Sequence, residues 1–125
     1  MKTAVTTVGS PHPAGPYSQG IVAGGFLFTA GVGPQDPQTG EKADTVADQT
    51  RQVLKSISAI LASAGASLDD VVKVTAHLQN LTSDFAEFNH AYHEFFTEPY
   101  PVRTTVGSTL SDILVEIDVV AKMPD

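Results

Sequence analysis

Two β-prone stretches close the chain, Tyr100-Pro101-Val102-Arg103-Thr104-Thr105 and Leu114-Val115-Glu116-Ile117-Asp118. The residues 107–111 between them are polar and turn-forming, so the two stretches predict a β-hairpin. In the register that this hairpin favours, Arg103 lies directly across from Glu116. Opposed residues of an antiparallel pair have Cβ atoms roughly 4.5–5.5 Å apart. The C-terminal strands therefore predict a cation and a carboxylate in one place.

The two charges in these apolar runs have two interpretations. A charge there is costly to bury unless it is paired or used. In the first interpretation they form a functional site, with Thr105 two residues along on the same face as Arg103. In the second they form a structural ion pair between strands, which is common in proteins. The local pattern leaves both open.

The rest of the chain predicts an α+β fold in one domain over residues 1–125. Its hydrophobic periodicities predict, in order, a strand 2–8, a hairpin 21–32 turning at Gly24-Gly25, a helix 44–64, a strand 71–79 and a helix 81–96. This order favours a mixed sheet with two helices on one face. The uncovered face has apolar content, which favours burial against another subunit.

The stretch 44–64 is the clearest helix. Its apolar residues form one stripe at helical spacing. Asp44 or Thr45 can cap its start, and Gly65 fits the left-handed position past its end. The other side of the helix is assigned to solvent and carries Asp48, Gln49, Arg51, Gln52, Lys55, Ser56 and Ser63.

Composition and charge exclude several classes of function. The net charge of −7, with only seven Lys and Arg residues, argues against binding to nucleic acids or anionic membranes. The chain has no cysteine, which excludes disulfides and thiolate metal sites and is compatible with a reducing compartment. No apolar run reaches the length of a membrane span, and the N-terminus lacks the apolar core of a signal peptide. We therefore expect a cytoplasmic protein.

The second helix carries three polar residues of interest, and Thr82 or Ser83 is expected to cap it. His90 and His93 have a spacing that can place two metal ligands on one side, but no third ligand stands out, so a solvated helix face is preferred. Asn89 lies amid an aromatic stripe. It is either a boundary residue or a polar group aimed at a site.

Six motifs follow one another along the chain. They are Gly15-Pro16-Tyr17-Ser18-Gln19-Gly20, Phe28-Thr29-Ala30-Gly31, Pro37-Gln38-Thr39-Gly40, Asn89-His90-Ala91-Tyr92 with Phe95-Phe96, Pro101-Val102-Arg103-Thr104-Thr105, and Val115-Glu116-Ile117. Together they closely resemble the RidA family of reactive intermediate deaminases. Older names for the family are perchloric-acid-soluble protein, translation inhibitor and endoribonuclease L-PSP. The resemblance covers essentially the whole chain.

The resemblance implies a chorismate-mutase-like α+β fold with a mixed six-stranded sheet and two helices on one face. It also implies a homotrimer, with three active sites in clefts between subunits. The implied activity is hydrolysis of an enamine or imine, typically 2-aminoacrylate in its 2-iminopropanoate form, to a 2-oxo acid and ammonia. The substrate is a small imine that bears a carboxylate, and neither a cofactor nor a metal is implied.

The resemblance also assigns roles to individual residues. Arg103 matches the arginine that clamps the substrate carboxylate, for which a planar guanidinium is suited. Glu116 matches the glutamate that positions and activates water, because an ionised carboxylate can accept a proton as water attacks the iminium carbon.

Four other positions match the family site. Thr105 stands where many members have cysteine, and the contribution of this position is largely through its backbone. Tyr17 and Asn89 match pocket residues, and Gly31 matches a backbone contact to the substrate. Many members read Ser-Gly-Gln where this chain has Ala30-Gly31-Val32, so the substrate range is left open.

Three alternatives to a deaminase remain at this point. The same trimer could bind a small carboxylate without turning it over, as a sensor or regulator. The older names suggest a ribonuclease or translation inhibitor, which the acidic balance of the chain disfavours. The protein could also be a purely structural trimer in which Arg103 and Glu116 form an interface salt bridge.

Overall fold

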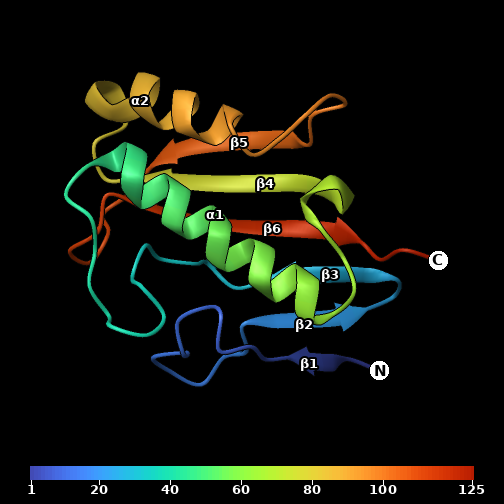
Figure 1. Ribbon diagram of the computed structural model, residues 1–125. Coiled ribbons are helices and arrows are strands. Elements are labelled where there is room, and N and C mark those ends of the chain that lie inside the picture. The colour runs from blue at the N-terminus through green and yellow to red at the C-terminus, as the bar shows by residue number, and fades with distance from the viewer.

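The computed structural model describes residues 1–125 as one six-stranded sheet and two α-helices (Figure 1). The strand order is β1-β2-β3-β6-β4-β5, and only the β4–β5 pair is parallel. The elements are β1 (Thr3–Val5), β2 (Gly20–Ala23), β3 (Phe26–Thr29), α1 (Val46–Ser63), the 3-10 helix η1 (Leu68–Asp70), β4 (Val71–Leu78), α2 (Leu81–His93), β5 (Val102–Gly107) and β6 (Val115–Lys122).

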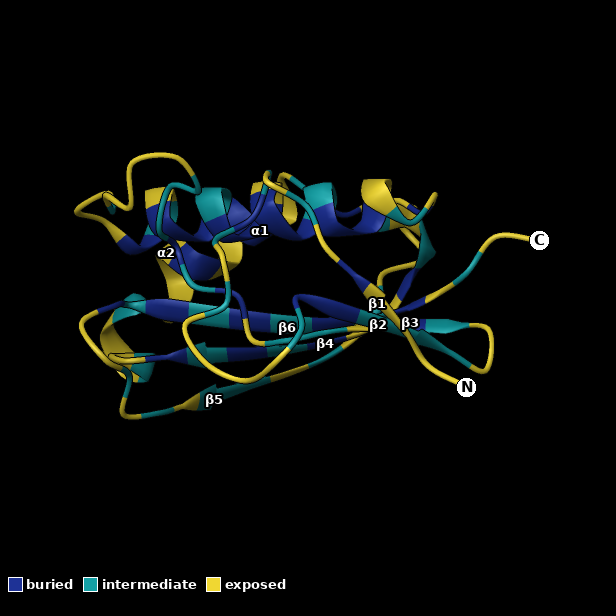
Figure 2. Cartoon of the chain, turned by 90° about the horizontal axis from the view of Figure 1, so that it is seen from below, coloured by how far each residue is buried: buried dark blue, intermediate teal, exposed yellow.

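Both helices lie on the same side of the sheet, and the other face of the sheet has no helix on it (Figure 2). The core forms between the helices and the alternate strand residues that face them, because successive side chains of a strand point to opposite faces. The predicted α+β architecture is therefore confirmed. The central strands contribute Val74, Ala76, Leu78, Val115, Ile117, Val119 and Ala121 to this core.

Helix α1 begins and ends where the sequence predicted. The Thr45 hydroxyl accepts a hydrogen bond from the Asp48 backbone N–H at 3.1 Å, and Gly65 has a φ of +86°. The assignment of one whole side to solvent is wrong for Gln49 and Ser56, which are buried. The Gln49 amide donates to the Ala43 carbonyl and accepts from the Leu114 N–H, so its burial is compensated.

The predicted C-terminal hairpin is wrong. β4, α2 and β5 form a β-α-β unit, and its helical crossover places β5 parallel to β4. β6 then pairs with the opposite edge of β4, so β4 lies between the two stretches that were expected to pair. The connection 108–114 crosses the end of β4, where Ser108 N–H donates to Leu78 O and Gln79 N–H donates to Leu114 O.

Other boundaries differ by a few residues. β1 is shorter than predicted, and β3 ends at Thr29, after which Val32 forms an isolated bridge with Ile117. Helix α2 begins at Leu81 with Asn80 at the N-cap position, so the predicted Thr82 or Ser83 cap is wrong. Neither helix is long and apolar enough to cross a membrane.

Candidate active site in two halves

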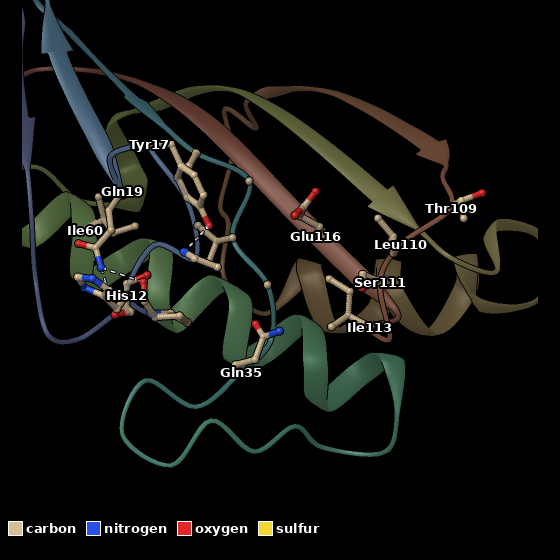
Figure 3. A pocket seen from close by; sticks show the side chains of 17 residues that line it. His12, Tyr17, Gln19, Gln35, Ile60, Thr109, Leu110, Ser111, Ile113 and Glu116 are labelled. Carbon is tan, nitrogen blue, oxygen red and sulfur yellow. Dashed lines mark hydrogen bonds between the residues drawn. The ribbon is translucent and has the colours of Figure 1, made fainter.

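Glu116 opens into a cavity of about 600 Å³ at one end of the sheet (Figure 3). It is half-buried, and its neighbours along β6, Val115 and Ile117, are fully buried under the helices. Glu116 therefore lies on the face without helices. Loop residues around it complete the cavity wall, among them Tyr17 and Leu110. Glu116 makes no hydrogen bond or ion pair within the chain, so its carboxylate is available for water or a ligand.

Position 31 requires a glycine because it lies against the Glu116 side chain. A Cβ atom at position 31 would lie 2.9 Å from Glu116 Cδ and 3.1 Å from Oε2. Its φ is not in the left-handed region, so the reason for glycine here is space and not backbone conformation. The structure places this predicted site residue against the predicted base.

Tyr17 lies on the proline-rich loop of the same cavity, and its hydroxyl accepts a hydrogen bond from Ala14 N–H at 3.2 Å. Gln19 holds this loop: its amide nitrogen donates to three carbonyls of residues 7–11, and its oxygen accepts from Thr7 N–H at 2.7 Å. Our sequence reasoning missed Gln19. Three prolines in the loop remove three backbone donors, so a donor from outside the loop was to be expected.

Arg103 lies in a second cavity, of about 700 Å³, between α2 and β5. Its guanidinium carbon is 4.6 Å from the ring centre of Tyr92, 5.4 Å from that of Phe88 and 5.9 Å from that of Phe85. Cation–π contacts of this kind hold a guanidinium without using its N–H groups. Arg103 makes no hydrogen bond or ion pair within the chain. Asn89, which the family resemblance assigns to the pocket, lines the same cavity as Arg103.

Arg103 and Glu116 do not meet within one chain. Arg103 is paired with Val74 of β4, whereas Glu116 is paired with His77 on the other edge of β4. Two strand spacings and three residues along β4 separate them by roughly 14 Å. They also lie on opposite faces of the sheet. The expected cross-strand pair is wrong, and so is a structural ion pair inside the chain.

Thr105 follows Arg103 on the same strand face but lines neither cavity. His77 is the cross-strand neighbour of Glu116. Its Nδ1 lies 2.7 Å from Ser108 Oγ, and its Nε2 lies 4.0 Å from Asp118 Oδ2. Burial raises the pKa of the Asp118 carboxyl, and His77 and Lys73 oppose that effect.

His90 and His93 both line the Arg103 cavity. His93 Nε2 lies 3.1 Å from the Tyr100 hydroxyl. The structure brings together no group of three His, Cys, Asp or Glu side chains that could hold a metal ion.

Comparisons with known proteins agree with this arrangement of elements. The family model described as endoribonuclease L-PSP matches residues 7–123. A RutC family protein of Pyrococcus horikoshii is 50% identical over 125 residues, covering 97% of this chain and 98% of the relative. A 2-iminobutanoate/2-iminopropanoate deaminase of Salmonella typhimurium is 37% identical over 126 residues, covering 97% and 98%. The crystal structure of Escherichia coli TdcF with bound serine superposes with a TM-score of 0.91 at 37% identity, covering 98% of this chain and 99% of that one.

Proposed function

The chain belongs to the endoribonuclease L-PSP family, also called the RidA family, and from this premise we propose that it hydrolyses small 2-imino acids to 2-oxo acids and ammonia. The observation that carries the proposal is a pair of complementary groups without partners. Arg103 is a cation with no acceptor, and Glu116 is a carboxylate with no donor. Each opens into its own cavity.

The two halves can form one site only between chains. We propose a homotrimer in which the Arg103 cavity of one subunit faces the Glu116 cavity of the next. The sheet face without helices supports an interface, because Phe28 and Val102 are 45% and 67% exposed there. Closed rings of this kind use two different surfaces of each subunit. The proposed location of the trimer is the cytoplasm.

The proposed reaction uses the two groups in sequence. Arg103 binds both carboxylate oxygens of the substrate and so fixes its position. Glu116 accepts a proton from water as the water oxygen bonds to the iminium carbon. That proton then passes from Glu116 to the nitrogen of the tetrahedral intermediate. The carbon–nitrogen bond breaks as the new hydroxyl gives its proton to Glu116 and its oxygen becomes the carbonyl of the 2-oxo acid, and ammonia is released. Tyr17, Asn89, Gly31 and Thr105 are proposed to line the substrate.

A coupled assay tests this proposal. A pyridoxal-phosphate dehydratase generates 2-aminoacrylate from serine, and pyruvate formation is followed with and without the protein. We expect acceleration by the parent protein, and a fall in kcat/KM of at least roughly tenfold for Arg103→Lys, because lysine cannot bind both oxygens. Glu116→Gln should also abolish the acceleration.

The only other arginine of the chain provides the control. Arg51 is ion-paired with Asp48 and Glu94 on the outer side of the helices, so Arg51→Lys should keep full activity. Equal activity of Arg103→Lys and the parent would contradict the proposal.

A second candidate function is carboxylate binding without turnover. Arg103 suits it equally, and the related TdcF structure contains bound serine. Binding of serine or pyruvate with no acceleration in the assay would favour this function. Glu116 favours hydrolysis over binding alone. Its carboxylate would repel a ligand carboxylate, so a site that only binds carboxylates has no use for it, whereas hydrolysis needs a base.

Ribonuclease activity, which the family description names, is the weaker alternative. A net charge of −7 opposes binding to RNA phosphates. RNA cleavage that persists through repeated purification and is lost in Arg103→Ala would restore it.

A further inference from the structure

The hydroxyl of Tyr92 is a buried polar group with no partner. Tyr92 is 7% exposed, and its oxygen has no hydrogen bond in the structure. Its ring stacks on Phe96 with ring centres 4.6 Å apart and contacts Phe88 at 5.7 Å. An unpaired hydroxyl among aromatic rings costs free energy, and such groups are rare in native proteins.

The fold does not need a hydroxyl at this position. The neighbouring positions of the same aromatic stripe carry phenylalanine: Phe85, Phe88, Phe95 and Phe96. Phenylalanine at position 92 could stack in the same way and would leave no polar atom unsatisfied. A polar group that packing does not explain points to a role in function.

The hydroxyl lies in the Arg103 half of the site. The guanidinium of Arg103 lies over the Tyr92 ring, and Tyr92 is one of the residues lining the Arg103 cavity. Burial raises the pKa of Tyr92, and the charge of Arg103 and the nearness of its N–H groups to the phenol oxygen oppose this, although no contact between them has the geometry of a hydrogen bond. A phenol with a raised pKa keeps its proton at neutral pH, so Tyr92 can act as a hydrogen-bond donor there.

We propose that Tyr92 is a second carboxylate-binding residue, whose hydroxyl donates a hydrogen bond to the carboxylate that Arg103 binds. The cation–π contacts hold the guanidinium but leave its N–H groups free, so a carboxylate that binds those groups can draw the guanidinium off the ring and reach the hydroxyl. Both groups then donate, which favours a carboxylate over an uncharged carboxamide. This inference rests on the proposed role of Arg103 as carboxylate anchor.

The test is an NMR titration of the assembled protein with pyruvate, and with pyruvamide as the ligand without a carboxylate. We expect Tyr92→Phe to weaken pyruvate binding about tenfold, as loss of a hydrogen bond to a charged group does. Pyruvamide should bind weakly to parent and variant alike. The melting temperature of Tyr92→Phe should be equal to or above that of the parent, because no bond in the fold is lost.

Thr50→Val provides the matched control. It also removes a buried hydroxyl, but one that donates to the Val46 carbonyl inside α1, away from the Arg103 cavity. Its affinity for pyruvate should equal that of the parent. A general effect of losing a buried hydroxyl would appear in both variants.

Three results would overturn the inference. Pyruvate affinity of Tyr92→Phe within twofold of the parent is the first. The second is a clear loss of melting temperature in this variant, which would make the hydroxyl a structural partner in the assembly. The third is absence of pyruvate binding by the parent, which would also remove Arg103 as an anchor.

Binding and turnover separate this inference from the deaminase proposal. Binding of pyruvate that depends on Tyr92, with no imine hydrolysis, would support the inference and contradict the deaminase. Imine hydrolysis by the parent, with unchanged pyruvate binding in Tyr92→Phe, would support the deaminase and contradict the role of Tyr92.

Discussion

At the scale of single residues, the contact between Gly31 and Glu116 links backbone packing to chemistry. The space for a side chain at position 31 is already filled by the Glu116 carboxylate. A methyl group there must push the carboxylate aside, since Glu116 is flexible and half-exposed whereas the backbone is held by the Val32–Ile117 bridge.

We therefore predict that Gly31→Ala lowers kcat/KM for imine hydrolysis by about tenfold or more, because small displacements of a catalytic group are costly. Stability should change little. The check is a double-mutant cycle with Glu116→Gln. If Gly31 acts through Glu116, the double variant is no slower than Glu116→Gln alone, and additive losses would contradict this explanation.

At the scale of secondary-structure elements, one buried glutamine holds the loop that carries Tyr17. The Gln19 amide nitrogen donates to the carbonyls of residues 7, 10 and 11, in a loop whose three prolines donate no backbone hydrogen bond. We predict that Gln19→Leu costs about 2–4 kcal/mol of unfolding free energy, because it orphans several buried backbone groups. Urea unfolding measures this cost.

Gln38→Leu is the control for this prediction, since Gln38 lies in an exposed turn where its side chain has no hydrogen bond. It should change the unfolding free energy by less than about 0.5 kcal/mol. Equal effects of the two substitutions would show that Gln19 does not hold the loop.

A surface ion pair links Arg51 of α1 to Glu94 at the end of α2, and its contribution to stability should depend on pH. Hydrogen bonds from Arg51 hold the pKa of Glu94 below its ordinary value of 4.5. A carboxyl with a lowered folded pKa stabilises the fold above its unfolded pKa and loses this effect as the pH falls through the folded value.

We accordingly expect Glu94→Gln to lower the melting temperature modestly at pH 7 and not at all in strong acid, where both forms are uncharged. Thermal melts across this pH range provide the measurement. Glu87→Gln, on the same helix but without an ion pair, should match the parent at every pH. A loss of stability that persists in acid would mean that packing, and not charge, is involved.

At the scale of the whole molecule, the separation of Arg103 from Glu116 makes a prediction about mixed assemblies. Arg103→Ala and Glu116→Gln should each be inactive as pure proteins. If equal amounts are unfolded together and refolded, about one quarter of the sites between subunits combine an intact Arg103 with an intact Glu116. Activity should return to about that fraction of the parent. No recovery, with mixed oligomers confirmed by mass spectrometry, would rule out a shared site.

The residues show how far prediction from the sequence could go. The motif residues Arg103, Glu116, Tyr17, Gly31 and Asn89 were named from the sequence, and each lines one of the two cavities, while their roles stay predictions. The sequence did not predict which of these residues lie together. A hairpin and a β-α-β unit are both compatible with the pattern of 100–118, and the choice depends on where α2 packs.

Local patterns alone were sufficient for the elements and for the family. The period of α1, its Thr45 cap, its terminal Gly65 and the motifs around Arg103 depend on residues close together in the chain, so they can be read without a structure. The strand order cannot be read in this way, because segments that are distant in sequence compete to pair with one another. Packing of α2 over β4 and β5 places β4 between Arg103 and Glu116. That non-local choice separates the two halves of the candidate site, and it also buries the Tyr92 hydroxyl.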